Sequence, residues 1–237
     1  MLSVDDISAH YGRVPALSGV TFHVDSGELL AIVGPNGAGK TTLAKSIAGF
    51  VAPTRGTISL DGQRIDHQRP DKLVRRGVRL VLEGHRVFPE LSVHENLRLG
   101  RLALTDTAQF AQRHEEVLEL FPILRQRLRQ PARELSGGQQ QLLALGQAFV
   151  GEPKLLICDE PSLGVAQRLI PEIMAVLRRM AERGMRIIVI EQVLSPALQV
   201  ADRVLVLNRG AAIARGTPSE FSRERLQELF LGTTTGN

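Results

Sequence analysis

Residues 34–41, GPNGAGKT, are the stretch that decides the fold of this chain of 237 residues. They fit the pattern G-x-x-x-x-G-K-[ST], in which a glycine-rich loop wraps its backbone around phosphate groups. The apolar run Glu28–Val33 before them has the length of a buried strand, and Thr42–Ala48 after them is helix-like. The alternative is a glycine-rich turn without a ligand. The motif has both flanks that it needs, so we expect a phosphate loop.

The residue types of this loop predict how a nucleotide is held. Backbone N–H groups at the start of the following helix point at the phosphates and favour their negative charge. Lys40 reaches the β- and γ-phosphates of the nucleotide, and the Thr41 hydroxyl is a ligand for Mg²⁺. The residues expected to bind nucleotide here are Gly34, Pro35, Asn36, Gly37, Ala38, Gly39, Lys40, Thr41 and Thr42.

Strand-like and helix-like segments alternate along the chain, which predicts an α/β fold with a mostly parallel sheet and helices on both of its faces. Further buried strands are expected at Val78–Leu82, Lys154–Cys158, Arg186–Ile190 and Val204–Leu207. An antiparallel β flank is expected from Leu2–His10, Val20–Val24 and Thr57–Leu60. Residues 89–150 have helical spacing and predict a helical lobe, inserted into a core formed by residues 1–88 and 151–237 of one domain. The tail after Gly232 is expected to be disordered.

Two carboxylates, Asp159 and Glu160, follow the expected strand Lys154–Cys158 directly. Ligands of open α/β sheets bind at the carboxyl ends of the strands, so both acids belong at that edge. Asp159 suits Mg²⁺, and Glu160 is placed to polarise a water for attack on the γ-phosphate. The alternative is a strand end followed by solvated acids without a ligand. The phosphate loop in the same chain makes this alternative less favoured. Cys158 is interpreted as a small buried apolar residue.

A second anion site is predicted about a hundred residues after the first. In the stretch Leu135–Gln139, Ser136 is followed by two glycines that open a helix and leave N–H groups bare at its positive end. One nucleotide does not need two such sites from one chain. We therefore expect each site to serve a different nucleotide, one of them held by another subunit. The residues expected to contact that nucleotide are Ser136, Gly137, Gly138 and Gln139.

Composition and charge narrow the class of protein. Apolar residues make up 43% and Cys158 is the only cysteine, which favours a cytosolic globular protein without disulfides. We expect no secretory or membrane-spanning segment. The net charge is +4 and aromatic residues are only 4%, so nucleic acid is not an expected partner. The clusters Arg75, Arg76, Arg79 and Arg125, Arg127, Arg129, Arg133 read as solvated faces, or alternatively as surfaces for anionic lipid or an acidic loop of a partner.

The phosphate loop, LSGGQ and LLICDEP, in this order and spacing, resemble the ATPase subunit of ABC transporters over the whole chain. The resemblance implies a P-loop NTPase core, the cofactors ATP and Mg²⁺, and a peripheral position on the cytoplasmic face of a membrane. It implies a second ABC ATPase subunit, whose signature LSGGQ completes each site head to tail, and separate transmembrane permease chains. Tyr11 matches the aromatic residue that stacks on adenine; packing on an edge strand is its alternative. The lobe, entered through residues 83–99, is expected to contact the permease.

Three positions depart from the family pattern. Glu83 stands where a glutamine usually touches Mg²⁺ and the water, Gln192 where a histidine usually contacts the γ-phosphate, and Gly164 where an aspartate often lies. With Glu160, we expect Glu83 and Gln192 to act in catalysis, and Glu83 to join Thr41 and Asp159 at the metal. Gln192 can donate a hydrogen bond but cannot titrate near neutral pH.

The stretches EGHRVFPELSVHENLRLG, PSLGVAQ and IEQ are similar to ATPases of branched-chain amino-acid uptake systems, which implies an importer. Uptake systems for amides or urea look alike. Two other functions stay open at this point: a nucleotide-gated clamp without transport, and a weakly hydrolysing regulatory subunit. The sequence has no long coiled-coil insertion, which argues against the clamp. The carboxylate at Glu160 argues against the regulatory subunit.

Overall fold

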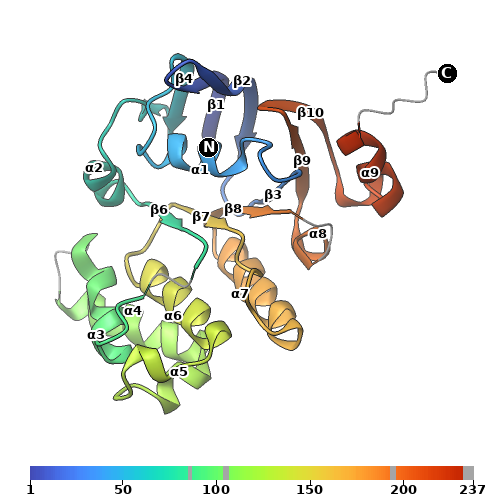
Figure 1. The fold of residues 1–237 in the computed structure, drawn as a ribbon. Helices are drawn as coiled ribbons and strands as arrows, with labels where there is room; N and C mark the ends of the chain where they lie inside the picture. The colour runs from blue at the N-terminus through green and yellow to red at the C-terminus, as the bar shows by residue number, and fades with distance from the viewer. Residues whose placement is uncertain (85–86, 104–106, 193–195, 232–237) are drawn as a thin grey trace.

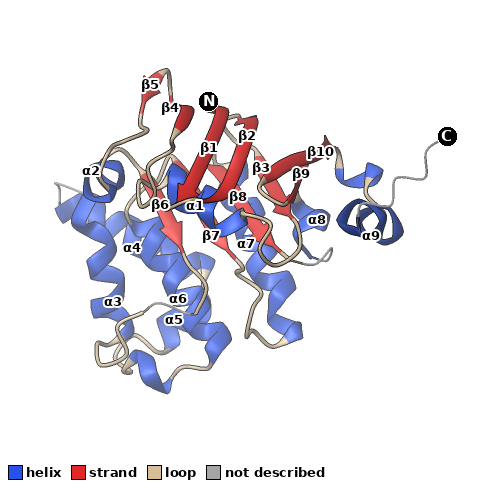
Figure 2. Ribbon diagram, turned by 45° about the horizontal axis from the view of Figure 1, so that its top comes forward, coloured by secondary structure: helices blue, strands red, loops and turns tan. Residues whose placement is uncertain are grey.

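The computed structural model describes residues 1–84, 87–103, 107–192 and 196–231. Its centre is a six-stranded sheet of order β10-β9-β3-β8-β7-β6, in which the neighbours from β9 to β6 are parallel and β10 is antiparallel to β9 (Figures 1 and 2). The strands are β3 (Leu29–Val33), β6 (Val78–Val81), β7 (Leu155–Asp159), β8 (Arg186–Glu191), β9 (Arg203–Asn208) and β10 (Ala211–Gly216). The expected parallel strands and the α/β class are confirmed.

The central sheet is apolar on both faces, because each face lies against its own core. Every residue of β3 and β7 is buried. Leu30 and Ile32 point to one core, whereas Ala31 and Val33 point to the other. This explains why these strands read as continuous apolar runs rather than as alternating ones. Cys158 on β7 is fully buried, as expected, and burial raises the pKa of its thiol.

On the first face lie α1 (Lys40–Ile47) and a second, antiparallel sheet of order β2-β1-β4-β5. Its strands are β1 (Leu2–Tyr11), β2 (Val14–Val24), β4 (Arg55–Leu60) and β5 (Gln63–Arg64). The expected antiparallel flank is confirmed, although β2 begins six residues before the predicted Val20. Those residues, VPALSG, are mostly exposed and carry a proline and a glycine. They join the sheet through pairing with β1, which no local pattern announces.

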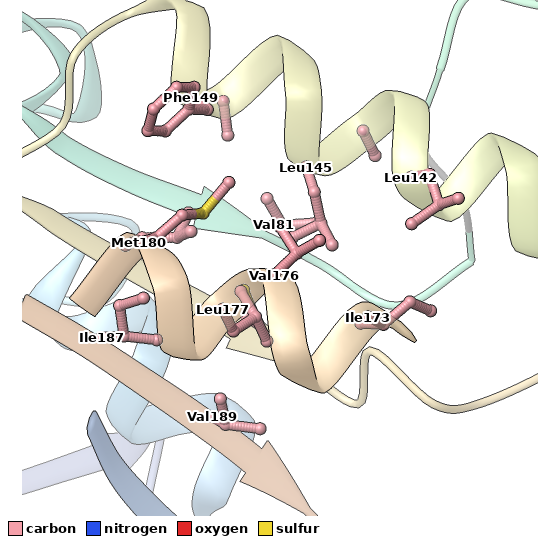
Figure 3. Close-up of a cluster of buried hydrophobic side chains, with 14 of the residues drawn as sticks. Val81, Leu142, Leu145, Phe149, Ile173, Val176, Leu177, Met180, Ile187 and Val189 are labelled. Carbon is pink, nitrogen blue, oxygen red and sulfur yellow. The ribbon is translucent and has the colours of Figure 1, made fainter. Parts of the chain in front are cut away.

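The opposite face is covered by α6 (Gly137–Val150) and α7 (Ile170–Glu182). Figure 3 shows Leu145 and Phe149 of α6 in one cluster with Val176 and Met180 of α7. Ile187 and Val189 of β8 complete the cluster from below (Figure 3). Burial of such side chains contributes about 1.5–3 kcal/mol each, so this contact fixes α6 to the sheet.

Helices make up the assigned elements of residues 93–103 and 107–150. They include α3 (Val93–Leu99), α4 (Thr107–Leu120), α5 (Pro122–Gln126) and α6. The Ser92 hydroxyl accepts the Glu95 N–H while the Glu95 carboxylate accepts the Ser92 N–H, a reciprocal cap that starts α3. The assignment of 89–150 to an inserted lobe stays a prediction.

The remaining helices are α2 (Pro70–Arg75), α8 (Pro196–Val200) and α9 (Arg223–Leu231). Arg79, on β6, corrects one expectation: it is buried rather than part of a solvated face, and it donates to the Val74 carbonyl at 2.9 Å. None of the helices assigned here is both long and apolar enough to cross a membrane, over the residues that the structure describes. The expectation for the tail after Gly232 lies outside those residues.

Two histidines meet between α3 and α4. His94 Nδ1 lies 3.1 Å from His114 Nε2, and the two rings meet edge to face. Burial, and then the charge of His94, lower the pKa of His114 below its ordinary value. The neutral pair shares a hydrogen bond, whereas two protonated rings would repel each other.

We therefore expect the contribution of His114 to the free energy of unfolding to be lost as the pH drops from about 7.5 to about 5.5. The unfolded chain binds the proton of His114 more readily, so this stability is complete above the ordinary histidine pKa of about 6.5 and is lost below it. Urea unfolding at several pH values measures the slope. His114→Gln is expected to reduce the slope of stability against pH, whereas the exposed His23→Gln is expected to leave that slope unchanged. Equal slopes in wild type and His114→Gln would contradict the assignment.

Candidate active site

The phosphate loop connects β3 to α1 at the carboxyl edge of the central sheet. Gly37 and Gly39 have φ values of +78° and +99°, which only glycine adopts readily. A Cβ at Gly39 would lie 2.6 Å from the Ala16 carbonyl oxygen, and one at Gly34 would lie 2.2 Å from that of Leu207. A Cβ at Gly37 would meet no atom within 4 Å, so the loop is open on that side. Packing thus requires two of the glycines, and the third leaves space for a ligand.

Lys40 begins α1 and is almost fully buried. Its ammonium donates to the carbonyl oxygens of Gly34 at 2.8 Å and Pro35 at 3.2 Å. It also lies 4.0 Å from Glu160 Oε1. Burial lowers the pKa of Lys40, and the carboxylates of Glu160, Asp159 and Glu191 oppose that shift. A buried cation inside a loop of phosphate-binding geometry suits an anionic ligand.

Asp159 ends β7, and only 2% of it is exposed. Neither carboxylate oxygen has a hydrogen bond of good geometry in the described part of the chain, although the Thr41 side chain lies close enough to stabilise its charge. Burial raises the pKa of Asp159; the Thr41 side chain opposes the rise, and the charge of Glu83 adds to it. A buried carboxylate without hydrogen-bond partners lowers the stability of the fold, and a bound divalent cation would compensate its charge. The donor set fits Mg²⁺ held by Asp159 and Thr41, with the exposed Glu83 near enough to act on Asp159 electrostatically.

Glu160 and Gln192, which are 32 residues apart in sequence, are joined at the ends of β7 and β8. Gln192 Nε2 donates to both carboxylate oxygens of Glu160 at 2.8 Å. Glu160 has a φ of +50°, unusual for a residue with a side chain, and its N–H donates to the Ile190 carbonyl at 2.9 Å. The backbone conformation and the amide together fix the position of the carboxylate beside Lys40.

Glu191 is a residue of this site that we did not predict from the sequence. It ends β8, is 5% exposed, and accepts the Ser162 N–H at 3.1 Å. Burial raises the pKa of its carboxyl. The argument that placed Asp159 at the carboxyl edge of the sheet also applies to Glu191, because β8 lies beside β7 and both strands end at the same edge.

Tyr11 lies at the end of β1 and pairs with Val14 across the first hairpin. Its side chain is exposed, which argues against a packing role in the core. Ala16, two residues after Val14, approaches Gly39 of the phosphate loop. The hairpin therefore places an exposed aromatic ring on the element that flanks the loop.

Ser136 caps the amino end of α6. Its hydroxyl accepts the Gln139 N–H at 3.4 Å, and Gln139 Oε1 accepts the Ser136 N–H at 3.0 Å. The N–H groups of Gly137 and Gly138 lie in the first turn, where no intrahelical acceptor exists. Gly138 packs closely against the Leu169 side chain, which would have to move to admit a Cβ at this position. Figure 1 shows α1 and α6 on opposite sides of the central sheet.

A protein-family model described as ABC transporter matches residues 17–163. The chain belongs to the ABC transporter family. It is an ATP-binding subunit of this family, an ATPase coupled to transport.

Known proteins resemble the chain over nearly its full length. It is 37% identical to the high-affinity branched-chain amino acid transport ATP-binding protein BraG of Pseudomonas aeruginosa, over 98% of this chain and 100% of that protein. It is 33% identical to the spermidine/putrescine import ATP-binding protein PotA of Bacillus cereus, over 100% of this chain and 71% of that protein. A solved ATP-binding subunit of an ABC transporter superposes with a TM-score of 0.85 at 32% identity, over 99% of this chain and 100% of the other.

The unpartnered Asp159 carboxylate leads to a prediction about stability. We expect Asp159→Asn to raise the free energy of unfolding of the nucleotide-free chain by about 1 kcal/mol, because it removes a buried charge that lacks hydrogen bonds. The same change is expected to abolish the additional stabilisation by MgATP. Thermal unfolding with and without MgATP measures both effects, and the exposed Asp25→Asn is the control. A less stable nucleotide-free Asp159→Asn variant would contradict this account.

Proposed function

We propose that this chain is the ATP-hydrolysing subunit of an importer for branched-chain or related amino acids. The observation that carries the substrate class is the 37% identity to BraG over the full length of both chains. PotA, named for spermidine and putrescine, is less similar and is longer than this chain. The stretches PSLGVAQ and IEQ, which differ from the usual family pattern, support the same branch.

We assign the residues of the carboxyl edge to ATP hydrolysis as follows. The phosphate loop and Lys40 bind the β- and γ-phosphates, and Tyr11 stacks on the adenine. Mg²⁺, held by Thr41, Asp159 and Glu83, would neutralise charge on the phosphates. Glu160 accepts a proton from the water as its oxygen attacks the γ-phosphorus in line and the bond to the bridging oxygen breaks. Lys40 exchanges the carbonyl oxygens of Gly34 and Pro35 for phosphate oxygens when ATP binds.

The signature at Ser136–Gln139 is proposed to complete the site of a partner ATPase subunit, either a second copy or a related chain. Its helix α6 packs in the core on the face of the sheet opposite α1, which supports a target outside this chain. The Ser136 hydroxyl uses an oxygen lone pair to accept the Gln139 N–H, so its proton stays available. That proton and the first-turn N–H groups would bind the γ-phosphate on the partner.

A groove between β6, α2 and the helices after residue 93 is the proposed contact with a transmembrane permease. It has a volume of about 320 Å³ and includes Phe88, Leu99 and Ala148. Phe88 is 54% exposed, an unusual position for a large apolar side chain. The groove adjoins β6, which leads to Glu83, so a permease segment in it would lie next to the nucleotide site. Docking there would hold the subunit on the cytoplasmic face of the membrane.

Replacing the proposed base tests the hydrolytic function. We expect Glu160→Gln to lower the rate of ATP hydrolysis by about a hundredfold or more, because the amide cannot accept the proton. An ATP-bound dimer is then expected to accumulate in size-exclusion chromatography. The exposed Glu172→Gln of α7 is the control, expected to hydrolyse ATP normally. Normal hydrolysis by Glu160→Gln would exclude Glu160 as the base.

Gln192 leads to a prediction about the pH dependence of hydrolysis. Its amide occupies both oxygens of Glu160 and does not titrate, so we expect this site to hydrolyse more slowly than one with histidine at that position. Gln192→His is expected to raise the single-turnover rate several-fold and to introduce a pH dependence between about pH 6 and 7.5. Gln192→Asn, which introduces no titrating group, is the control.

The same difference predicts asymmetry if the partner subunit carries a histidine there. Single-turnover rates with each site disabled in turn would then show the slower site on this chain's phosphate loop. Equal rates at the two sites, or an unchanged pH profile for Gln192→His, would refute the role of Gln192.

A further inference from the structure

A cavity of about 640 Å³ lies at the edge of the central sheet opposite the nucleotide site. Three of its residues mark where parallel strands start: Gly77 precedes β6, Lys154 precedes β7, and Arg186 begins β8. The carboxyl ends of β7 and β8 carry Asp159 and Glu191 of the nucleotide site. The cavity is therefore separated from that site by the full length of the strands.

The cavity is strongly basic. It is lined by six cationic side chains, against the two acidic side chains of Asp61 and Glu152. The cations are Arg75, Arg76, Arg113, Lys154, Arg183 and Arg186. They come from α2 and the turn after it, α4, and the turns that lead into β7 and β8. A basic last turn favours the end of a helix such as α2, but this does not account for the convergence of the other four.

Both acidic side chains are already paired. The Glu152 carboxylate contacts Arg113 and accepts from Gln109 Nε2 at 2.7 Å. The Asp61 carboxylate contacts Arg186 at 2.6 Å and the N-terminal ammonium at 3.0 Å. These acids thus offset the charge of Arg113 and Arg186, and Arg183 lies 3.7 Å from the Glu116 carboxylate outside the cavity lining.

Arg75, Arg76 and Lys154 make no ion pair within the described ranges of the chain. Arg76 and Lys154 also line a smaller hollow, together with Asp61. Like charges that converge repel one another, and a bound anion would reverse the sign of that interaction.

Arg186 and two apolar residues give the cavity a fixed floor. Arg186 is 8% exposed, and its guanidinium is held by Asp61 and by the Lys154 carbonyl at 3.4 Å. Phe149 and Met185, both buried, contribute apolar surface. A rigid, partly apolar floor under a cationic rim suits an organic phosphate better than a simple halide or sulfate.

We propose that this cavity binds a small anion that carries two or more phosphate groups. Its volume lies within the range of ordinary ligand sites, about 300–1,000 Å³. The unpaired cations Arg75, Arg76 and Lys154 supply the attraction, and several phosphate oxygens are needed to satisfy them together. A free polyphosphate compound and a phosphate-rich lipid headgroup share this chemistry. The proposed site is separate from the phosphate loop with Lys40, so the proposal does not depend on nucleotide binding there.

Titration calorimetry with inorganic pyrophosphate, at about 150 mM salt to screen exposed charges, tests the proposal. The full chain is used with Lys40→Ala, which weakens the phosphate loop as a competing site. We expect one pyrophosphate to bind per chain. Arg76→Ala combined with Lys154→Ala is expected to weaken that affinity about tenfold or more, equivalent to about 1.4 kcal/mol.

The matched control combines Arg129→Ala with Arg215→Ala, which removes two exposed cations that lie outside the cavity and form no ion pair within the described chain. It is expected to change the affinity less than twofold. Flotation with vesicles of phosphatidylcholine, with and without the diphosphate lipid cardiolipin, separates the two sources. Retention only by the cardiolipin vesicles, lost in the cavity variant, assigns the site to a lipid headgroup. Equal weakening by both double variants, or no binding of pyrophosphate or anionic vesicles, would overturn the proposal.

Discussion

Parallel pairing of strands that are buried on both faces is the constraint on which the rest of the structure depends. β3, β7 and β8 run in one direction, so the segments that follow them meet at one edge. That edge receives the phosphate loop from β3, Asp159 and Glu160 from β7, and Glu191 and Gln192 from β8. The contacts that join the three strands, Lys40 with Glu160 and Gln192 with Glu160, link residues that are far apart in sequence. The buried strands fix the positions of these residues, so the geometry of the site depends on the packing of the two cores.

The electrostatics of this edge are those of a site built for a cation and a phosphate together. The carboxylates of Asp159, Glu160 and Glu191 all act on the ammonium of Lys40. Asp159 and Glu191 are buried, and burial raises the pKa of both carboxyls. The protein keeps these acids where they lower its own stability, as functional sites often do. A divalent cation would offset part of the negative charge of these carboxylates.

The strands of the central sheet could be predicted from the sequence because burial on two faces makes them continuous apolar runs. β10 could not be predicted, since its sequence AAIARG consists mostly of small residues that are partly exposed. Only pairing with β9 makes this segment a strand. The phosphate loop and Asp159 followed from local patterns. The contact of Gln192 with Glu160 did not, because it depends on the register between β7 and β8. Arg79 was misassigned to a solvated face because sequence alone does not show that it lies against Val74.

The reciprocal cap between Ser136 and Gln139 has a kinetic consequence. The amino end of α6 is already ordered in the single chain by its own side chains and by the packing of Gly138 against Leu169. A partner that docks on it would meet a finished surface and would not have to freeze a loop. Little conformational entropy would then be lost at each encounter and regained at each release. If the subunit pairs with a partner as proposed, local folding of this surface would not limit the rate of each encounter.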